Sequence, residues 1–130
     1  MEDVKINVKI KLSALWVAVM FLYAYADIKA FFVPGIIEEI IAGESRGIPI
    51  TQVSLLGTAI LMLIPSVMVF LSLTLKANVN LWVNIILGIF YTGVMLISLL
   101  MPGVWAYYLA YASVEIVLTS LIAWYAWKWP

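Results

Sequence analysis

The sequence lacks cysteine and histidine entirely. Disulfide bonds, thiol chemistry, haem ligation by these side chains and the usual zinc sites are therefore excluded, and we expect no metal and no cofactor. Charged residues are scarce, at 11% of the chain, against about 25% in ordinary soluble domains. Basic and acidic residues balance to a net charge of zero and form no block of one sign, so we expect no nucleic-acid partner.

Hydrophobic residues, by contrast, make up 66% of the 130 residues, more than a soluble chain of this length can bury. The lipid bilayer is therefore the expected solvent. A helix needs ~20 apolar residues to cross a hydrocarbon core of ~30 Å. The apolar segments that meet this length cover residues 12–33, 52–75, 81–101 and 105–127. We predict an all-α polytopic membrane protein, an antiparallel bundle of four transmembrane helices forming a single membrane domain over residues 1–130.

The connections between these segments carry turn-forming residues: Pro34-Gly35, residues 76–78 and Pro102-Gly103. The second and third connections are short, which predicts antiparallel neighbours. The first is longer, and it contains isoleucines 36, 37, 40 and 41 at helical spacing beside glutamates 38, 39 and 44. This pattern predicts a short amphipathic helix lying in the membrane interface and ended by Gly43 and Gly47.

The placement of basic residues predicts the orientation, because lysine and arginine favour the cytoplasmic side. Lys5, Lys9, Lys11, Lys76 and Lys128 all fall at the same end of the predicted bundle. We therefore expect a multi-pass protein of the cell membrane with both termini cytoplasmic. Trp16 falls at the same end, and we expect it in an interfacial belt of aromatic residues.

Glu115 lies near the middle of the fourth apolar segment, ~15 Å below the surface at which that helix starts. A charge at this depth is costly, and ionisable residues there usually face a bundle interior or a water-filled path. No lysine or arginine in any span is placed to neutralise it. We therefore expect a protonated carboxyl held by hydroxyl groups such as those of Tyr91 and Thr119.

Other polar residues fall on faces shared with this carboxyl or at nearby depths. Tyr91 lies near the midplane, whereas Asp27, Tyr111 and Thr58 form a layer ~7 Å from the outer boundary. Helical spacing of three, four or seven residues places these groups on shared faces. The candidate ligand-binding or proton-binding residues are Glu115, Asp27, Tyr91, Tyr111, Tyr108, Tyr23, Asn84 and Thr58.

A structural interpretation competes with a functional one. Serine, threonine, asparagine and tyrosine also link membrane helices by hydrogen bonds of ~1 kcal/mol each. Pro65 frees a backbone carbonyl within the second segment, which suits either a cavity or simple packing. Gly57, Gly88 and Gly93 allow helices to approach closely.

Three stretches carry a resemblance that covers nearly the whole chain: LWVAVMFLYAYADIKA, PITQVSLLGTAILMLIPSVMV and VEIVLTSLIAWYAWKW. They include Asp27, Pro65 and Glu115, respectively. The chain resembles a family of small, uncharacterised four-helix membrane proteins of bacteria and archaea, and more distantly the DoxX-like membrane proteins. This resemblance implies the four-helix fold and supplies no activity.

Two functional hypotheses follow. In the first, the bundle binds or transports a small, partly apolar molecule, with Glu115 exchanging a proton and Asp27 gating the outer side. In the second, the protein is a structural or accessory subunit, in which Glu115 contacts a partner helix or a second copy in a homo-oligomer. No segment matches a catalytic motif, so enzyme activity is the minor hypothesis.

Overall fold

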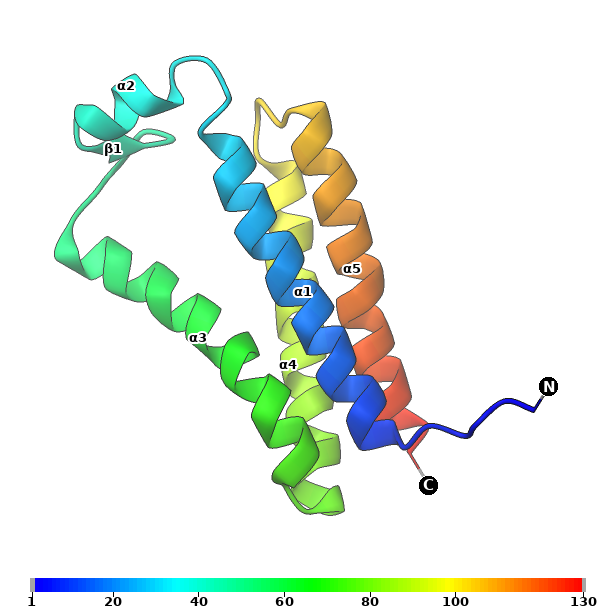
Figure 1. Ribbon diagram of the computed structural model, residues 1–130. Coiled ribbons are helices and arrows are strands. Elements are labelled where there is room, and N and C mark those ends of the chain that lie inside the picture. The colour runs from blue at the N-terminus through cyan, green and yellow to red at the C-terminus, as the bar shows by residue number, and fades with distance from the viewer. Residues whose placement is uncertain (1, 130) are drawn as a thin grey trace.

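The computed structural model describes residues 2–129 and consists mainly of four long helices (Figure 1). These are α1 (Val8–Ala30), α3 (Gln52–Thr74), α4 (Ala77–Leu100) and α5 (Ala106–Trp127). A short helix α2 (Ile36–Ile41) and a hairpin of strands β1 (Glu44–Ser45) and β2 (Ile48–Pro49) connect α1 to α3. Each long helix has the length and composition needed to cross a membrane. The prediction of four membrane-length apolar helices is confirmed, and insertion into a membrane stays a prediction.

Side-chain caps mark the N-terminal ends of α1 and α3. Helix α1 begins at Val8, four residues before the predicted segment, because the side chain of Asn7 accepts a hydrogen bond from the backbone N–H of Lys9. Helix α3 begins at its predicted residue, where Thr51 and Ser54 form a reciprocal capping box. Helix α4 starts at Ala77, also before the predicted segment at 81.

Helices α1 and α4 run in one direction and α3 and α5 in the other (Figure 1). The two chain ends and the turn between α3 and α4 therefore lie at one end of the molecule, called here the terminal end. Helix α2, the hairpin and the turn between α4 and α5 lie toward the other end, called the hairpin end. This arrangement agrees with termini on a common side of a membrane.

The packing order is α3, α1, α5, α4, with extensive contacts between each neighbouring pair. Helices α3 and α4 are consecutive in the chain and run antiparallel, but their backbones are close at few places. The predicted antiparallel neighbours are confirmed for α4 and α5, which pack closely. Helices α3 and α4 are joined by side-chain hydrogen bonds, whereas the N-terminal half of α3 extends away from the bundle (Figure 1).

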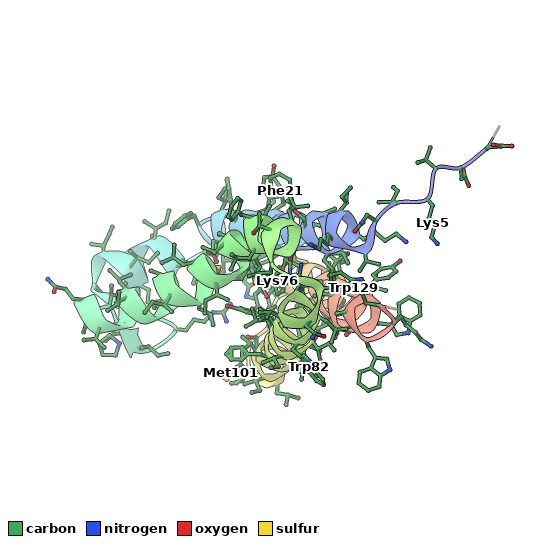
Figure 2. The ribbon with its side chains drawn as sticks, turned by 90° about the horizontal axis from the view of Figure 1, so that it is seen from below. Lys5, Phe21, Lys76, Trp82, Met101 and Trp129 are labelled. Atoms are coloured by element: carbon green, nitrogen blue, oxygen red, sulfur yellow. The ribbon has the colours of Figure 1, made fainter. Side chains whose placement is uncertain are left out.

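The bundle's outer surface is apolar on all sides. Figure 2 shows Phe21 and Trp82 pointing away from the helices on opposite sides, and 58% and 57% of their surfaces are exposed. A helix bundle with aromatic side chains exposed around its circumference matches lipid surroundings better than aqueous ones.

Helices α4 and α5 approach each other closely at Gly88. A Cβ atom there would lie 2.9 Å from the backbone oxygen of Thr119 and 3.0 Å from the backbone nitrogen of Ala123. The expectation of close helix contact is confirmed at Gly88. It is wrong at Gly57 and Gly93, where an added Cβ would meet no atom within 4 Å.

The segment between α1 and α3 contains the predicted short helix and an unpredicted hairpin. Gly43 follows the end of α2 with a φ of 85°, as expected of a helix-ending glycine. Gly47 instead belongs to the hairpin turn, together with Arg46, and both have positive φ angles, of 77° and 52°. The backbone N–H of Gly47 donates to a carboxylate oxygen of Glu39, which holds the turn against α2. The location of α2 at a membrane interface stays a prediction.

Candidate functional site

All four long helices line an internal cavity of about 160 Å³. It lies in the half of the bundle toward the hairpin end, because its lining comes from late α1 and α4 and from early α5. The lining residues are Tyr23, Ala26 and Asp27 of α1, Leu61 and Met62 of α3, Tyr91, Val94, Met95 and Ser98 of α4, and Tyr108 and Glu115 of α5.

Helical periodicity explains why residues separated in the sequence line the same cavity. Tyr23 and Asp27 are four residues apart on α1, and Tyr108 and Glu115 are seven apart on α5. Each pair therefore lies on one helix face. With Tyr91, the structure brings together five of the eight residues singled out in the sequence.

Glu115 is 1% exposed, and its Oε1 atom is buried without a hydrogen-bond partner among residues 2–129. The hydroxyls expected to hold it have other partners. Thr119 Oγ1 donates to the backbone oxygen of Glu115 at 2.9 Å and also lies 2.7 Å from Thr92 Oγ1. The Tyr91 hydroxyl donates to the backbone oxygen of Leu61 at 2.6 Å. The carboxyl of Glu115 is therefore free to bind something other than its neighbours in the chain.

The Tyr91 bond has a specific cause in α3. In a helix, the backbone oxygen of Leu61 would accept from the N–H of residue 65, and this residue is a proline, which has none. Tyr91 supplies the missing donor from α4 across the bundle. The free carbonyl expected from Pro65 thus links α3 to α4 at a point far from their short connection.

Tyr23 supplies a second polar atom without a partner. Its side chain is 7% exposed, and its hydroxyl is buried and makes no hydrogen bond within the described chain. Its ring lies 6.3 Å from that of Tyr91, centre to centre. Because buried polar atoms in native proteins almost always have partners, two such atoms on one cavity make it the candidate site of this protein.

The hairpin end of the cavity is more open. Asp27 is exposed although it belongs to the lining. Tyr108 is half-buried, and the guanidinium carbon of Arg46 lies 5.1 Å from the centre of its ring. The hairpin therefore reaches a wall residue of the cavity. Sequence reasoning missed this contact because it did not predict the hairpin.

Asn84 lies outside the cavity, in a separate buried network nearer the terminal end. Its Oδ1 atom accepts from Trp16 Nε1 at 2.8 Å, and its amide nitrogen donates to Asn80 Oδ1 at 2.6 Å. Asn80 in turn donates to the backbone oxygen of Ser72 at 2.7 Å. These bonds join α1, α3 and α4, so Asn84 links helices. Trp16 is fully buried, and its expected place in an interfacial belt is wrong.

Two further predicted site residues also lie outside the cavity. Thr58 is exposed and donates to backbone oxygens of its own helix, because the N-terminal half of α3 diverges from the bundle. Tyr111 is half-exposed, and its ring lies 6.4 Å, centre to centre, from that of Tyr107, which does not line the cavity either. The assumption of straight, parallel helices fails for α3.

The cavity's chemistry limits what it can do. Its lining offers two carboxyl groups, three tyrosines, one serine and apolar side chains, without a basic residue. Among residues 2–129, no cluster of three or more acidic side chains is placed to hold a metal ion. These features suit non-covalent binding of a small molecule.

Fold and cavity together define a protein of four membrane-length helices with an internal acidic and aromatic cavity. The chain belongs to a family of unknown function, DUF6326, whose pattern matches residues 3–130. The predicted membership of an uncharacterised family is therefore confirmed. No curated protein and no solved structure matches the chain.

Proposed function

We propose that this chain is an integral protein of the cell membrane, with residues 1–130 forming one membrane domain and both termini in the cytoplasm. Four membrane-length helices and the clustering of lysines at the terminal end support this orientation. Helix α2 then lies at the outer interface, with Ile37 and Ile41 exposed toward lipid. The prokaryotic origin and the DoxX-like layout stay predictions.

Within this domain, the cavity binds a small, partly apolar molecule, and transport coupled to a proton is the activity that it suits. The burial of Glu115 inside the bundle carries this proposal, since a residue used for assembly would lie on the outside. Glu115 exchanges the proton, and Asp27 gates the exposed end. Tyr23, Tyr91 and Tyr108 form the aromatic walls.

An untargeted search by native mass spectrometry tests this function. The purified protein is released from detergent micelles, and molecules that remain bound are identified from the mass difference. Wild type should carry a small ligand that Glu115→Gln lacks. Glu38→Gln makes the same chemical change on the exposed surface of α2 and should keep the ligand. Equal ligand occupancy in wild type and Glu115→Gln would show that Glu115 does not contribute to ligand binding.

The alternative function is that of a structural or accessory subunit. The feature that supports it is a surface groove that does not include Glu115. A shallow groove on the outer side of α4 and α5 is lined by Ile89, Thr92, Gly93, Leu96, Ser120 and Ala123. Small residues of this kind allow a further helix to approach. Gly93→Leu would fill the groove, and a smaller oligomer on size-exclusion chromatography in detergent would favour this alternative.

A further inference from the structure

We infer that the molecule bound in the cavity is a small organic cation, an amine with an apolar body about the size of benzene. This inference rests on the proposed binding function and specifies its substrate class. Three independent properties of the cavity support it: the sign of its charged groups, its unpartnered polar atoms, and its aromatic and apolar walls.

The first property is charge. Glu115 and Asp27 line the cavity, and no lysine or arginine does. Arg46 contacts Tyr108 from the hairpin and is not part of the lining. An anionic ligand would meet two carboxyl groups and no basic residue among those that line the cavity, whereas a cation would supply the partner that the buried Glu115 carboxylate lacks.

The second property is the pair of atoms without partners. Glu115 Oε1 and the Tyr23 hydroxyl are both buried, and both residues line the cavity. An ammonium group has up to three N–H donors and no acceptor. One donor can bind the carboxylate oxygen and another the hydroxyl oxygen of Tyr23, so a single group satisfies both.

The third property is the aromatic and apolar character of the cavity lining. The rings of Tyr23 and Tyr91 lie 6.3 Å apart, and tyrosine faces attract cations within about 6 Å of their centres. Leu61, Met62 and Met95 supply apolar surface for the remainder of the molecule. A cavity of about 160 Å³ is close to the ~150 Å³ apolar cavity that accommodates benzene, which sets the size of the ligand.

Binding of the cation is expected to release one proton from Glu115. Where the carboxyl of Glu115 is protonated, an ammonium ion forms the ion pair only if this proton leaves to solvent. Binding should therefore strengthen as the pH rises, by up to tenfold per pH unit for one proton released.

The other ionisable groups that face the cavity are few. Asp27 and Tyr23 face it from α1, Tyr91 from α4 and Tyr108 from α5, and α3 contributes only apolar residues. Arg46 of the hairpin contacts Tyr108, and Asp27 is the second carboxyl group of the lining. Asp27 is therefore the group that a control must remove, by Asp27→Asn.

Three probes with the same ring distinguish the ligand classes: benzylammonium, benzyl alcohol and benzoate. Binding to the whole protein in lipid nanodiscs is measured by isothermal titration calorimetry, with empty nanodiscs to subtract partitioning into lipid. Benzylammonium should bind at least about tenfold more tightly than benzyl alcohol, and benzoate should not bind. Glu115→Gln should remove this preference, and Glu38→Gln should keep it.

The pH series is run between about pH 5 and 8, where an alkylammonium group stays charged as lysine does. The rise of benzylammonium affinity with pH should persist in Asp27→Asn and disappear in Glu115→Gln. Tyr23→Phe, which keeps the ring, should weaken benzylammonium binding and retain the pH dependence. Circular dichroism and size-exclusion chromatography establish that each variant is folded.

Two results separate failure of the inference from failure of the proposed function. Benzyl alcohol binding as tightly as benzylammonium, or Glu115→Gln retaining the preference for the cation, would refute a cation site and leave small-molecule binding intact. Binding of none of the three probes, together with no ligand difference between wild type and Glu115→Gln in native mass spectrometry, would refute both.

Discussion

The bond between Tyr91 and Leu61 allows a double-mutant test of how the bundle is held together. Tyr91→Phe removes the hydroxyl that donates to the backbone oxygen of Leu61 and keeps the buried ring. In wild type this oxygen has no helical donor, because residue 65 is proline. Pro65→Ala restores a backbone N–H at that position, so the oxygen no longer depends on Tyr91.

The expected magnitudes follow from this difference. Leaving a buried acceptor without a donor costs about 1–3 kcal/mol. Hydrogen bonds between membrane helices average nearer ~0.6 kcal/mol, up to ~1.7. Tyr91→Phe should therefore lower the free energy of unfolding by about 1–2 kcal/mol in the wild-type background. In the Pro65→Ala background the loss should fall by about 1 kcal/mol, which is the coupling energy of the cycle.

Unfolding is followed by tryptophan fluorescence during titration of mixed micelles with a denaturing detergent. Tyr25→Phe serves as the matched control, because Tyr25 points outward with 55% of its surface exposed and should tolerate the change. Equal losses for Tyr91→Phe in the wild-type and Pro65→Ala backgrounds would show that the proline is not the reason for the bond.

Three further predictions use other parts of the fold. Gly88→Ala should destabilise the bundle by about 1–3 kcal/mol relative to Gly93→Ala in the same unfolding assay, because only at Gly88 does the added methyl group meet facing backbone; equal stability would contradict the close approach. A single cysteine introduced by Ser45→Cys should react with a membrane-impermeant reagent on intact cells, and labelling only after lysis would reverse the orientation. Asn84→Leu should lower the free energy of unfolding by about 1–3 kcal/mol, since Trp16 loses its acceptor, and unchanged stability would argue against the network.

The sequence predicts the four long helices well, because length and apolarity alone decide whether a segment can span a membrane. It also identifies Glu115, Asp27, Tyr23, Tyr91 and Tyr108 as residues that share helix faces, and these five line one cavity. Spacing within a helix is a local property, so it can be read without knowing how the helices pack.

Contacts between helices are not local, and here the sequence-based predictions fail. Asn84 shares a face of α4 with Tyr91, yet it lies two turns nearer the terminal end and meets Trp16 instead of the cavity. Thr58 has the expected depth only if α3 follows the bundle axis, which it does not. The hairpin is too short for strand periodicity to reveal it, and only Gly47 of its turn is a residue that such turns favour.

The two polar regions of the interior also bear on whether the protein would transport the proposed ligand or only bind it. The cavity lies toward the hairpin end, whereas the network of Trp16, Asn80 and Asn84 joins α1, α3 and α4 nearer the terminal end. Trp16 connects the two regions, because its ring contacts that of Tyr91 edge-on at 5.9 Å. Release toward the terminal end would require these bonds to break within a low-dielectric interior, where unpaired polar groups are costly. A binding protein needs no such opening, whereas a transporter would require a second conformation in which α4 separates from α1 and α3 at this network and the amides of Asn80 and Asn84 find other partners or water.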